Sequence, residues 1–165
     1  MKKISTRTAD NSDLDSLCNL YFEFHEFHAL YLPTFLKSLG KPTEQERVEL
    51  TQAIMQILNH EDSVILVAEE QGIIIGFAEV HLKQPDAADR AKSSTPYAHL
   101  QSLGVTKASR RMKVGTQLLQ AAEAWARNRE ALELRLDIWE FSAGPLGFYH
   151  KSGYRTFRRS LVKAL

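Results

Sequence analysis

The sequence predicts a single α/β domain whose sheet mixes antiparallel and parallel strands. Strand-like and helix-like segments alternate along the whole chain, and its second half has the order strand, helix, strand of a parallel βαβ crossover. A length of 165 residues with 44% hydrophobic residues suits one compact core, and no repeat or linker divides the chain. We therefore expect residues 1–165 to form one domain.

The first half of the chain predicts one strand and two helices. Residues 3–9 alternate in polarity like a half-buried strand. Residues 11–24 and 43–58 have apolar positions at helical spacing, each with a capping-box pattern at its start, Ser12 with Asp15 and Thr43 with Glu46. Between them, proline and glycine predict a connecting loop from residue 28 to residue 42.

The rest of the chain predicts a hairpin followed by alternating elements. Two β-branched runs flank a turn that includes Gly72, which is typical of an antiparallel hairpin. A polar surface loop follows at residues 83–96. The predicted strands are 63–70, 72–82, 97–105, 131–139 and 154–162, and the predicted helices are 114–128 and 145–152.

Charge and cysteine usage exclude several classes of protein. The formal net charge of +1 gives no global electrostatic support for binding nucleic acid. Cys18 is the only cysteine, which excludes an intramolecular disulfide and fits a reducing compartment. The sequence has no apolar run of membrane-spanning length and no signal-peptide pattern, so we expect a soluble, cytoplasmic protein without nucleic-acid or membrane partners.

The strand at residues 97–105 has an irregular apolar spacing. Leu100 and Leu103 are three residues apart, whereas Leu103 and Val105 are two apart, and a regular strand buries every second residue. One explanation is a β-bulge around Gln101 and Ser102, which would free backbone groups for a ligand. The other is that Leu100 and Leu103 face opposite sides of a sheet covered on both faces.

A basic turn links this strand to the next helix. Arg110, Arg111 and Lys113 come just before Gly115, where the first helical turn has unpaired N–H groups. Helix N-termini of this kind bind phosphate, and the basic side chains would add positive charge. A basic cluster of this kind can equally be a solvated surface turn.

At this point the sequence resembles the GNAT superfamily of N-acetyltransferases. The family pattern is a strand ending in Leu-x-Val, four residues, and then Arg/Gln-x-x-Gly-x-Gly/Ala; here Leu103-Gly104-Val105 and "TKAS" precede "RRMKVG" at residues 110–115. Lys113 stands where the family has its middle glycine. A helical backbone there would tolerate lysine, whose ammonium could itself meet a phosphate.

A second motif is similar to the closing pattern of the same family. Phe148-Tyr149 and Lys151-Ser152-Gly153-Tyr154 are in register with the family's short helix and last turn, and the strong match covers residues 97–157. The resemblance implies a mixed, mostly antiparallel sheet of six to seven strands. It also implies about four flanking helices and a splayed parallel strand pair in the centre.

The resemblance further implies acetyl-CoA as co-substrate, with no metal. The Leu103 N–H would face the thioester oxygen, Ser142 would contact the CoA arm, and Tyr149 would protonate the departing thiolate. The implied cofactor-binding residues are Leu103, Gly104, Val105, Arg110, Arg111, Met112, Lys113, Val114, Gly115, Thr116, Ser142 and Tyr149.

The sequence does not identify a single residue as the general base. Many relatives have a glutamate in the fourth strand, but Gln101 and Ser102 occupy that place here. Glu79 and His99 are the preferred substitutes, and the other candidates are Glu23, His25 and His28. His25 and His28, three apart on one helix face, could also be read as a metal pair, but no third ligand is evident.

The sequence thus predicts an N-acetyltransferase that moves an acetyl group from acetyl-CoA to a primary amine of a small molecule or peptide in a ternary complex. Phe24, His28 and Tyr31 are the expected acceptor-binding residues. The alternatives are a non-catalytic acyl-CoA-binding or interaction module of the same fold, and a dinucleotide-binding oxidoreductase. The resemblance makes a homodimer possible, through the last strand or residues 27–35.

Overall fold

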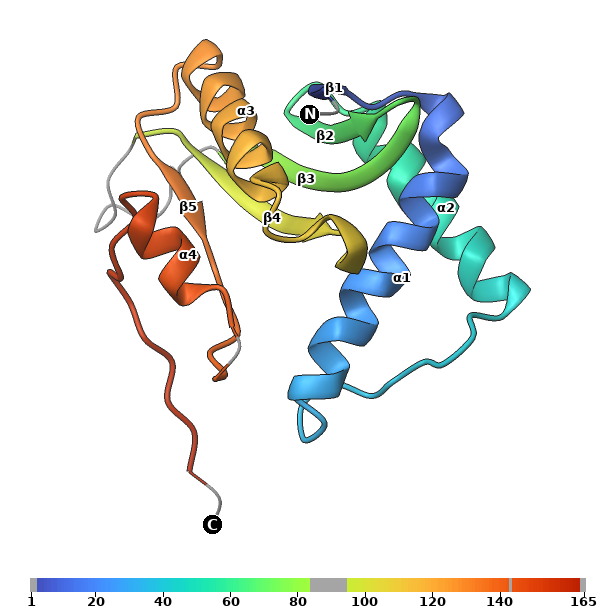
Figure 1. Ribbon diagram of the computed structural model, residues 1–165. Helices are drawn as coiled ribbons and strands as arrows, with labels where there is room; N and C mark the ends of the chain where they lie inside the picture. The colour runs from blue at the N-terminus through green and yellow to red at the C-terminus, as the bar shows by residue number, and fades with distance from the viewer. Residues whose placement is uncertain (1–2, 84–94, 143, 164–165) are drawn as a thin grey trace.

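The structure is a computed structural model that describes residues 3–83, 95–142 and 144–163 (Figure 1). A five-stranded sheet separates α1 and α2 on one face from α3 on the other. The strands are β1 (Ile4–Thr8), β2 (Ser63–Glu70), β3 (Ile73–Lys83), β4 (Tyr97–Val105) and β5 (Leu134–Leu136). The helices are α1 (Leu14–Tyr31), α2 (Glu44–Leu58), α3 (Val114–Asn128) and α4 (Leu146–Lys151), with 3-10 turns at Asn11–Asp13 and Lys107–Ser109.

The strands lie in their order along the chain, from β1 to β5. The first three pairings are antiparallel and only β4 and β5 are parallel, which confirms the predicted hairpin and the βαβ crossover through α3. One core packs between the sheet and α1 and α2, around Phe77 and Leu17. The other packs between the sheet and α3, around Leu118 and Val80, and includes Tyr149 of α4.

The irregular spacing in β4 is a β-bulge. Glu79 pairs with Ser102, but the next residue, Val80, pairs with Leu100, so that Gln101 is the extra residue. Leu100 and Leu103 consequently pack in the same core on the α3 side of the sheet. The explanation in which these two leucines face opposite sides is wrong.

The helix starts follow capping chemistry, with one correction. Thr43 and Glu46 form the predicted capping box of α2. Ahead of α1, the box is made by Asp10 and Asp13 rather than by Ser12 and Asp15. Asp13 also accepts two hydrogen bonds from the Arg7 guanidinium, which fixes the chain where it leaves β1.

The predicted loop at residues 28–42 begins too early. The first helix continues to Tyr31 because apolar residues extend its buried face, Ala29 among them, and Pro33 disfavours helical backbone at Leu32. The predicted loop at 83–96 lies almost entirely outside the described residues.

Two further expectations about the sheet are wrong for the described part of the chain. The sheet has five strands rather than six or seven, and the parallel pair is at its edge rather than in its centre. The predicted strand at 131–139 is reduced to Leu134–Leu136, because its pairing with β4 stops there. Residues 154–162 form no strand: Tyr154 packs against the core, and the chain after it extends away from the body of the molecule, with Phe157, Leu161 and Val162 68%, 92% and 79% exposed.

The turn ahead of α3 has an unusual backbone. Lys113, the N-cap residue, has φ +64° and ψ +12°, and Arg111 has φ +67°. These are left-handed conformations that glycine adopts most easily, so Lys113 does not have the helical backbone that would tolerate a lysine without strain. A lysine in this conformation costs about 1–2 kcal/mol relative to a right-handed one.

No helix in residues 3–83, 95–142 or 144–163 is both long and apolar enough to cross a bilayer.

Gly104 leaves room for the Phe77 ring of the neighbouring strand β3. A Cβ at Gly104 would lie 2.6 Å from Cε1 of Phe77, whereas a Cβ at Gly115 in α3 would meet only ordinary contacts at 3.6 Å. We expect Gly104→Ala to lower the free energy of unfolding by about 1–3 kcal/mol through overpacking. The control Gly115→Ala should be neutral or stabilise by about 0.5–1 kcal/mol. Urea unfolding of both variants measures this, and equal stability of the two would contradict it.

The positive φ at Lys113 predicts an order of stability between two variants that lose the same charge. Lys113→Gly should be more stable than Lys113→Ala by about 1 kcal/mol, because only the Cβ distinguishes them in a left-handed conformation. Thermal unfolding at fixed salt concentration provides the comparison. A more stable alanine variant would show that residue 113 is not left-handed in solution.

Candidate active site

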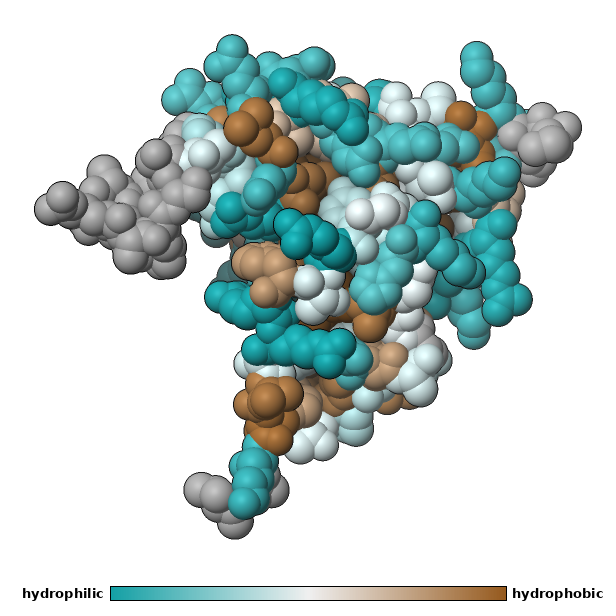
Figure 2. All heavy atoms as spheres, turned by 90° about the vertical axis from the view of Figure 1, so that its left-hand side faces the viewer, coloured by the Kyte–Doolittle hydropathy of each residue, from teal (hydrophilic) through white to brown (hydrophobic). Residues whose placement is uncertain are grey.

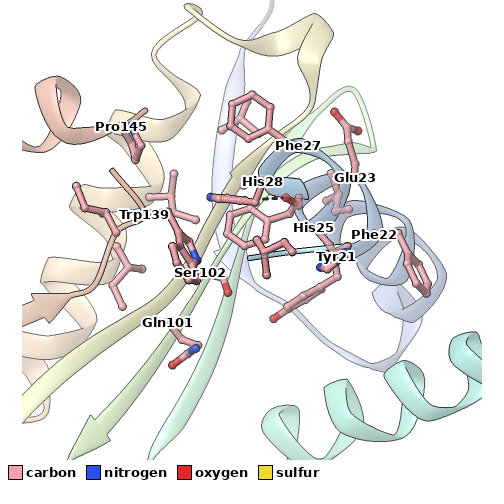
Figure 3. Close-up of a pocket in the computed structure, with 18 of the residues that line it drawn as sticks. Tyr21, Phe22, Glu23, His25, Phe27, His28, Gln101, Ser102, Trp139 and Pro145 are labelled. Carbon is pink, nitrogen blue, oxygen red and sulfur yellow. Dashed lines mark hydrogen bonds between the residues drawn. The ribbon is translucent and has the colours of Figure 1, made fainter. Parts of the chain in front are cut away.

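A cleft of about 1060 Å³ opens between α1, the second half of β4, and the segment that runs from β5 to α4 (Figure 3). The pairing of β4 with β5 ends at Leu100 and Leu136, and from there both chains continue along the cleft. In Figure 3 the α1 side chains lie on one side of the cleft, while Trp139 and Pro145 lie on the other. The cleft is therefore built where the parallel pair opens.

Aromatic side chains of α1 form one wall of this cleft. Phe24, His28 and Tyr31, the expected acceptor-binding residues, all line it. Tyr31 stacks on Phe141 from the β5–α4 segment with ring centroids 5.0 Å apart, and Phe35 lies 5.6 Å from Trp139. These ring contacts join the end of α1 to the opposite side of the cleft.

The two histidines of α1 each bond to a backbone carbonyl. His28 Nδ1 lies 2.8 Å from the carbonyl oxygen of Phe24, and His25 Nε2 lies 2.9 Å from that of Lys37. Because a carbonyl only accepts, both ring nitrogens donate, and neither of them is free to ligate a metal. The described residues contain no group of three or more His, Cys, Asp or Glu side chains arranged for a metal ion.

Glu23 is already engaged by the turn after β4. Its Oε1 accepts a hydrogen bond of 2.9 Å from the backbone N–H of Lys107. This bond ties α1 to the turn that leads into α3, so Glu23 has a structural partner.

Glu79 lies below the cleft in a chain of hydrogen bonds. It is 6% exposed, and its carboxylate accepts a 2.7 Å bond from the Tyr21 hydroxyl of α1. The other carboxylate oxygen lies 2.7 Å from Nε2 of His81, whose Nδ1 lies 2.8 Å from the Ser63 hydroxyl. Burial, and next the adjacent Glu79 charge, raise the pKa of Tyr21 far above its ordinary value, so this phenol stays protonated. Tyr21 lines the cleft, whereas Glu79 is reached behind it.

His99 is the second candidate base, and it lines the cleft directly. Burial lowers its pKa below the ordinary value, against the opposing effect of Asp137, whose Oδ2 is 4.0 Å from Nε2. The imidazole is therefore neutral at physiological pH and able to accept a proton.

The structure brings only part of the predicted cofactor set to the cleft. Leu103, Gly104, Val105, Arg110 and Tyr149 line it. The remaining predicted residues of this turn and of the first turn of α3 do not: Arg111, Met112, Lys113, Val114, Gly115 and Thr116. Ser142 is exposed in the β5–α4 segment and is also not among the lining residues.

Arg110 and Tyr149 have distinct environments. The Arg110 guanidinium lies 4.3 Å from the centre of the Phe27 ring and donates to the Val105 carbonyl at 3.2 Å. Tyr149 is almost fully buried against Phe148 and Tyr154, and burial raises its pKa to about 12.

Tyr21 and His81 are the site residues that sequence reasoning missed. Tyr21 fits the apolar stripe of the first helix, so its spacing alone indicates a core residue. His81 is two residues after Glu79, which places both side chains on the same face of β3. The spacing of Glu79 and His81 is the sequence feature that could have indicated a polar pair on this face of β3.

Comparison with known proteins agrees with this geometry. Residues 20–154 match the family model described as Acetyltransferase (GNAT) family. No curated protein sequence matches the chain.

Solved structures with the same fold are numerous. A tetramutant of the BH1408 protein from Bacillus halodurans has a TM-score of 0.84 at 18% identity, covering 98% of this chain and 99% of that one. A GNAT family acetyltransferase from Staphylococcus aureus has a TM-score of 0.68 at 21% identity, with full coverage of both chains. The aminoglycoside N-acetyltransferase AAC(6')-Iy, in complex with CoA, has a TM-score of 0.73 at 18% identity and covers 100% and 96%.

These identities establish the fold, and the family model covers most of the chain. With β4 bulged and opening from β5 beside a basic turn, the chain belongs to the GNAT acetyltransferase family.

Proposed function

We propose that the protein is an N-acetyltransferase that transfers the acetyl group of acetyl-CoA to a primary amine by direct attack in a ternary complex. One observation carries the proposal: the bulged part of β4 that continues beyond its pairing with β5, the buried Tyr149 and an aromatic α1 wall all meet in one cleft. We further propose that residues 1–165 act as one cytoplasmic catalytic domain.

The CoA arm would lie where β4 and β5 separate. Leu103 and Val105 are beyond the last parallel pair, so we expect the backbone groups of Leu103 and the Val105 N–H to pair with the pantetheine amides, while the Val105 carbonyl already accepts from Arg110. The diphosphate would sit at the first turn of α3, held by backbone N–H groups with Arg110, Arg111 and Lys113 nearby. Met112, Val114, Gly115 and Thr116 complete that turn, and Ser142 would contact the arm after a local rearrangement.

The chemistry requires a neutral amine, a polarised carbonyl and a proton for the leaving thiolate. The Leu103 N–H next to the bulge would stabilise the oxyanion. Tyr149 would supply the proton: a pKa of about 12 keeps it protonated during turnover. The same pKa makes donation to a thiolate of pKa ~8.5 more uphill than for an ordinary tyrosine, so Tyr149 must act through close positioning. Glu79 and His99 are the proposed bases.

The acceptor would be a small-molecule or peptide amine. Phe24, His28 and Tyr31 provide apolar and aromatic contacts, while Glu46, Glu49 and Asp137 add carboxylates to the lining. A cationic amine suits this combination, since carboxylates and aromatic faces both attract it. Because the fold is similar to that of an aminoglycoside acetyltransferase, aminoglycosides belong to the first set of acceptors to test.

The function is tested by CoA release from acetyl-CoA with a panel of polyamines, aminoglycosides and amino-terminal peptides, together with calorimetric titration of CoA. We expect CoA to bind and at least one amine to give turnover. Tyr149→Phe should lower kcat about 100-fold with little change in CoA affinity, whereas the control Tyr97→Phe, outside the cleft, should leave kcat unchanged.

CoA binding without turnover on any amine, and no effect of Tyr149→Phe, would favour the non-catalytic acyl-CoA-binding module instead. Failure to bind CoA would remove both functions.

We also propose a homodimer. Figure 2 shows the C-terminal segment projecting from the body, with apolar side chains exposed along it. The outer edge of β5 has no strand beside it among the described residues. An open edge and an apolar extended segment fit together between two copies.

Sedimentation velocity at micromolar concentration should therefore give a dimer. Removal of residues 155–165 should convert the dimer to monomer, while Leu30→Ser, an exposed apolar position on α1, should not. A full-length protein that sediments only as monomer would end this part of the proposal.

A further inference from the structure

The hydrogen bonds around Glu79 form a connected path from the cleft into the sheet. Tyr21 is on α1, Glu79 and His81 are on β3, and Ser63 is at the start of β2. Each link is 2.7 or 2.8 Å long. The α1-facing side of β3 otherwise packs large apolar side chains such as Phe77, so a carboxylate with two polar neighbours is exceptional there.

The direction of each hydrogen bond follows from the groups involved. An ionised carboxylate only accepts, so the Tyr21 O–H and the His81 Nε2–H both donate to Glu79. His81 Nδ1 is then left to accept from the Ser63 hydroxyl. The phenol oxygen of Tyr21 keeps a lone pair that can accept a hydrogen bond from the cleft, which Tyr21 lines.

We propose that Tyr21 relays the proton of the acceptor ammonium to Glu79, and that His81 with Ser63 holds the Glu79 carboxylate in place for this transfer. The inference rests on the proposed acetyltransferase function and assigns its base: Glu79 is the acceptor of the proton, Tyr21 its contact with substrate, and His81 a positioning residue. Figure 3 shows Tyr21 projecting from α1 toward the strands at the cleft.

The transfer balances without an additional reactant. One N–H bond of the ammonium breaks and an O–H bond forms at Tyr21, while the original Tyr21 proton moves to Glu79 Oε2. The electron pair of the broken N–H bond becomes the lone pair that attacks the thioester carbonyl carbon. The C–S bond of the tetrahedral adduct then breaks and Tyr149 protonates the departing thiolate, while the second N–H proton passes to water in the cleft and from there restores the phenol of Tyr149. After product release, the proton on Glu79 returns through Tyr21 to water in the open cleft.

A relay explains why Tyr21 remains a phenol throughout. Its strongly raised pKa disfavours a free phenolate, so the proton must leave to Glu79 as the new proton arrives. The other groups that face this carboxylate are His81 on β3 and, across the strand pair from His81, His99 on β4. His99 is therefore the competing base, and the test must separate the two.

The test compares kcat/KM for two acceptors, an alkylamine of pKa ~10.4 and a matched amine of pKa about 8, across pH 6–10. Tyr21→Phe and Glu79→Gln should each lower kcat/KM for the alkylamine about 100-fold at pH 7. The loss of kcat/KM for the alkylamine should shrink as the pH approaches the pKa of that amine. At pH 7 the loss should be much smaller for the amine of pKa about 8. The double variant should lose no more than either single variant, because both residues act on one proton.

Controls separate this role from a structural one. Tyr97→Phe and Glu133→Gln make the same chemical changes outside the cleft and should retain wild-type rates. Titration of CoA and thermal unfolding identify any variant that has lost its fold. His81→Leu should reproduce the loss that depends on amine pKa, and His81→Gln, whose amide can still donate to Glu79, should restore part of the rate.

The outcomes distinguish the inference from the function on which it rests. Turnover by the wild type together with unchanged Tyr21→Phe kinetics overturns the relay alone. A loss in Tyr21→Phe and Glu79→Gln that is equal for both amines and constant with pH shows a structural role and also overturns it. The relay is also overturned if His99→Gln is the variant whose kcat/KM loss depends on the pKa of the amine, while Tyr21→Phe and Glu79→Gln show no such loss. A wild type that binds CoA but acetylates no amine overturns both the function and the relay.

Discussion

The single extra residue in β4 determines the geometry of the site. Side chains alternate along a strand, so a register shift of one residue exchanges the two faces of everything beyond it. With Gln101 bulged, His99 stays on the α1 side opposite His81, Ser102 lies opposite Glu79, and Leu100 and Leu103 both remain in the α3 core. Both the core on the α3 side and the polar side chains under the cleft, Glu79, His81, His99 and Ser102, depend on this one bulge.

The shape of the cleft also depends on how α1, which forms one of its walls, is held against the sheet. Gly104 gives Phe77 and Phe24 room to pack between helix and strand, and Glu23 fastens the same helix to the turn before α3. Because α1 provides Tyr21 at one turn and Phe24 and His28 at the next turns, the proposed relay residue and the proposed acceptor wall share one helix. The opposite side, from β5 to α4, contacts α1 mainly through aromatic rings, Tyr31 with Phe141 and Phe35 with Trp139.

Much of the fold could be predicted from sequence because its signals are local. The spacing of Leu100, Leu103 and Val105 indicated an irregular strand, with a bulge as one of two explanations, and Thr43 with Glu46 was enough to place the start of α2. The last strand was not predictable in the same way: residues 154–162 have strand-like composition, but a strand needs a hydrogen-bonded neighbour, and no strand of the described residues pairs with them. The backbone of the turn before α3 was not predictable either. Lys113 is left-handed because of the path that the chain takes into α3, and a lysine in a sequence does not indicate that conformation.

Within the site, the residues that the family resemblance implied could be named from the sequence, whereas the residues brought there by packing alone could not. Phe24, His28, Tyr31, Leu103 and Tyr149 line the cleft, and the roles assigned to them stay predictions. Tyr21 could not be distinguished from a core residue, because its partner Glu79 is 58 positions away in sequence. His81 matters only because that same carboxylate lies beside it.

We propose that the acetyl thioester lies at the opening between β4 and β5, beside the bulge. A crystal structure with CoA tests it most directly. We expect the CoA sulfur between Leu103 and Tyr149, the pantetheine arm along Leu103 to Val105, and the diphosphate at the first turn of α3. A CoA molecule bound elsewhere, or one whose sulfur is remote from both Leu103 and Tyr149, would contradict it.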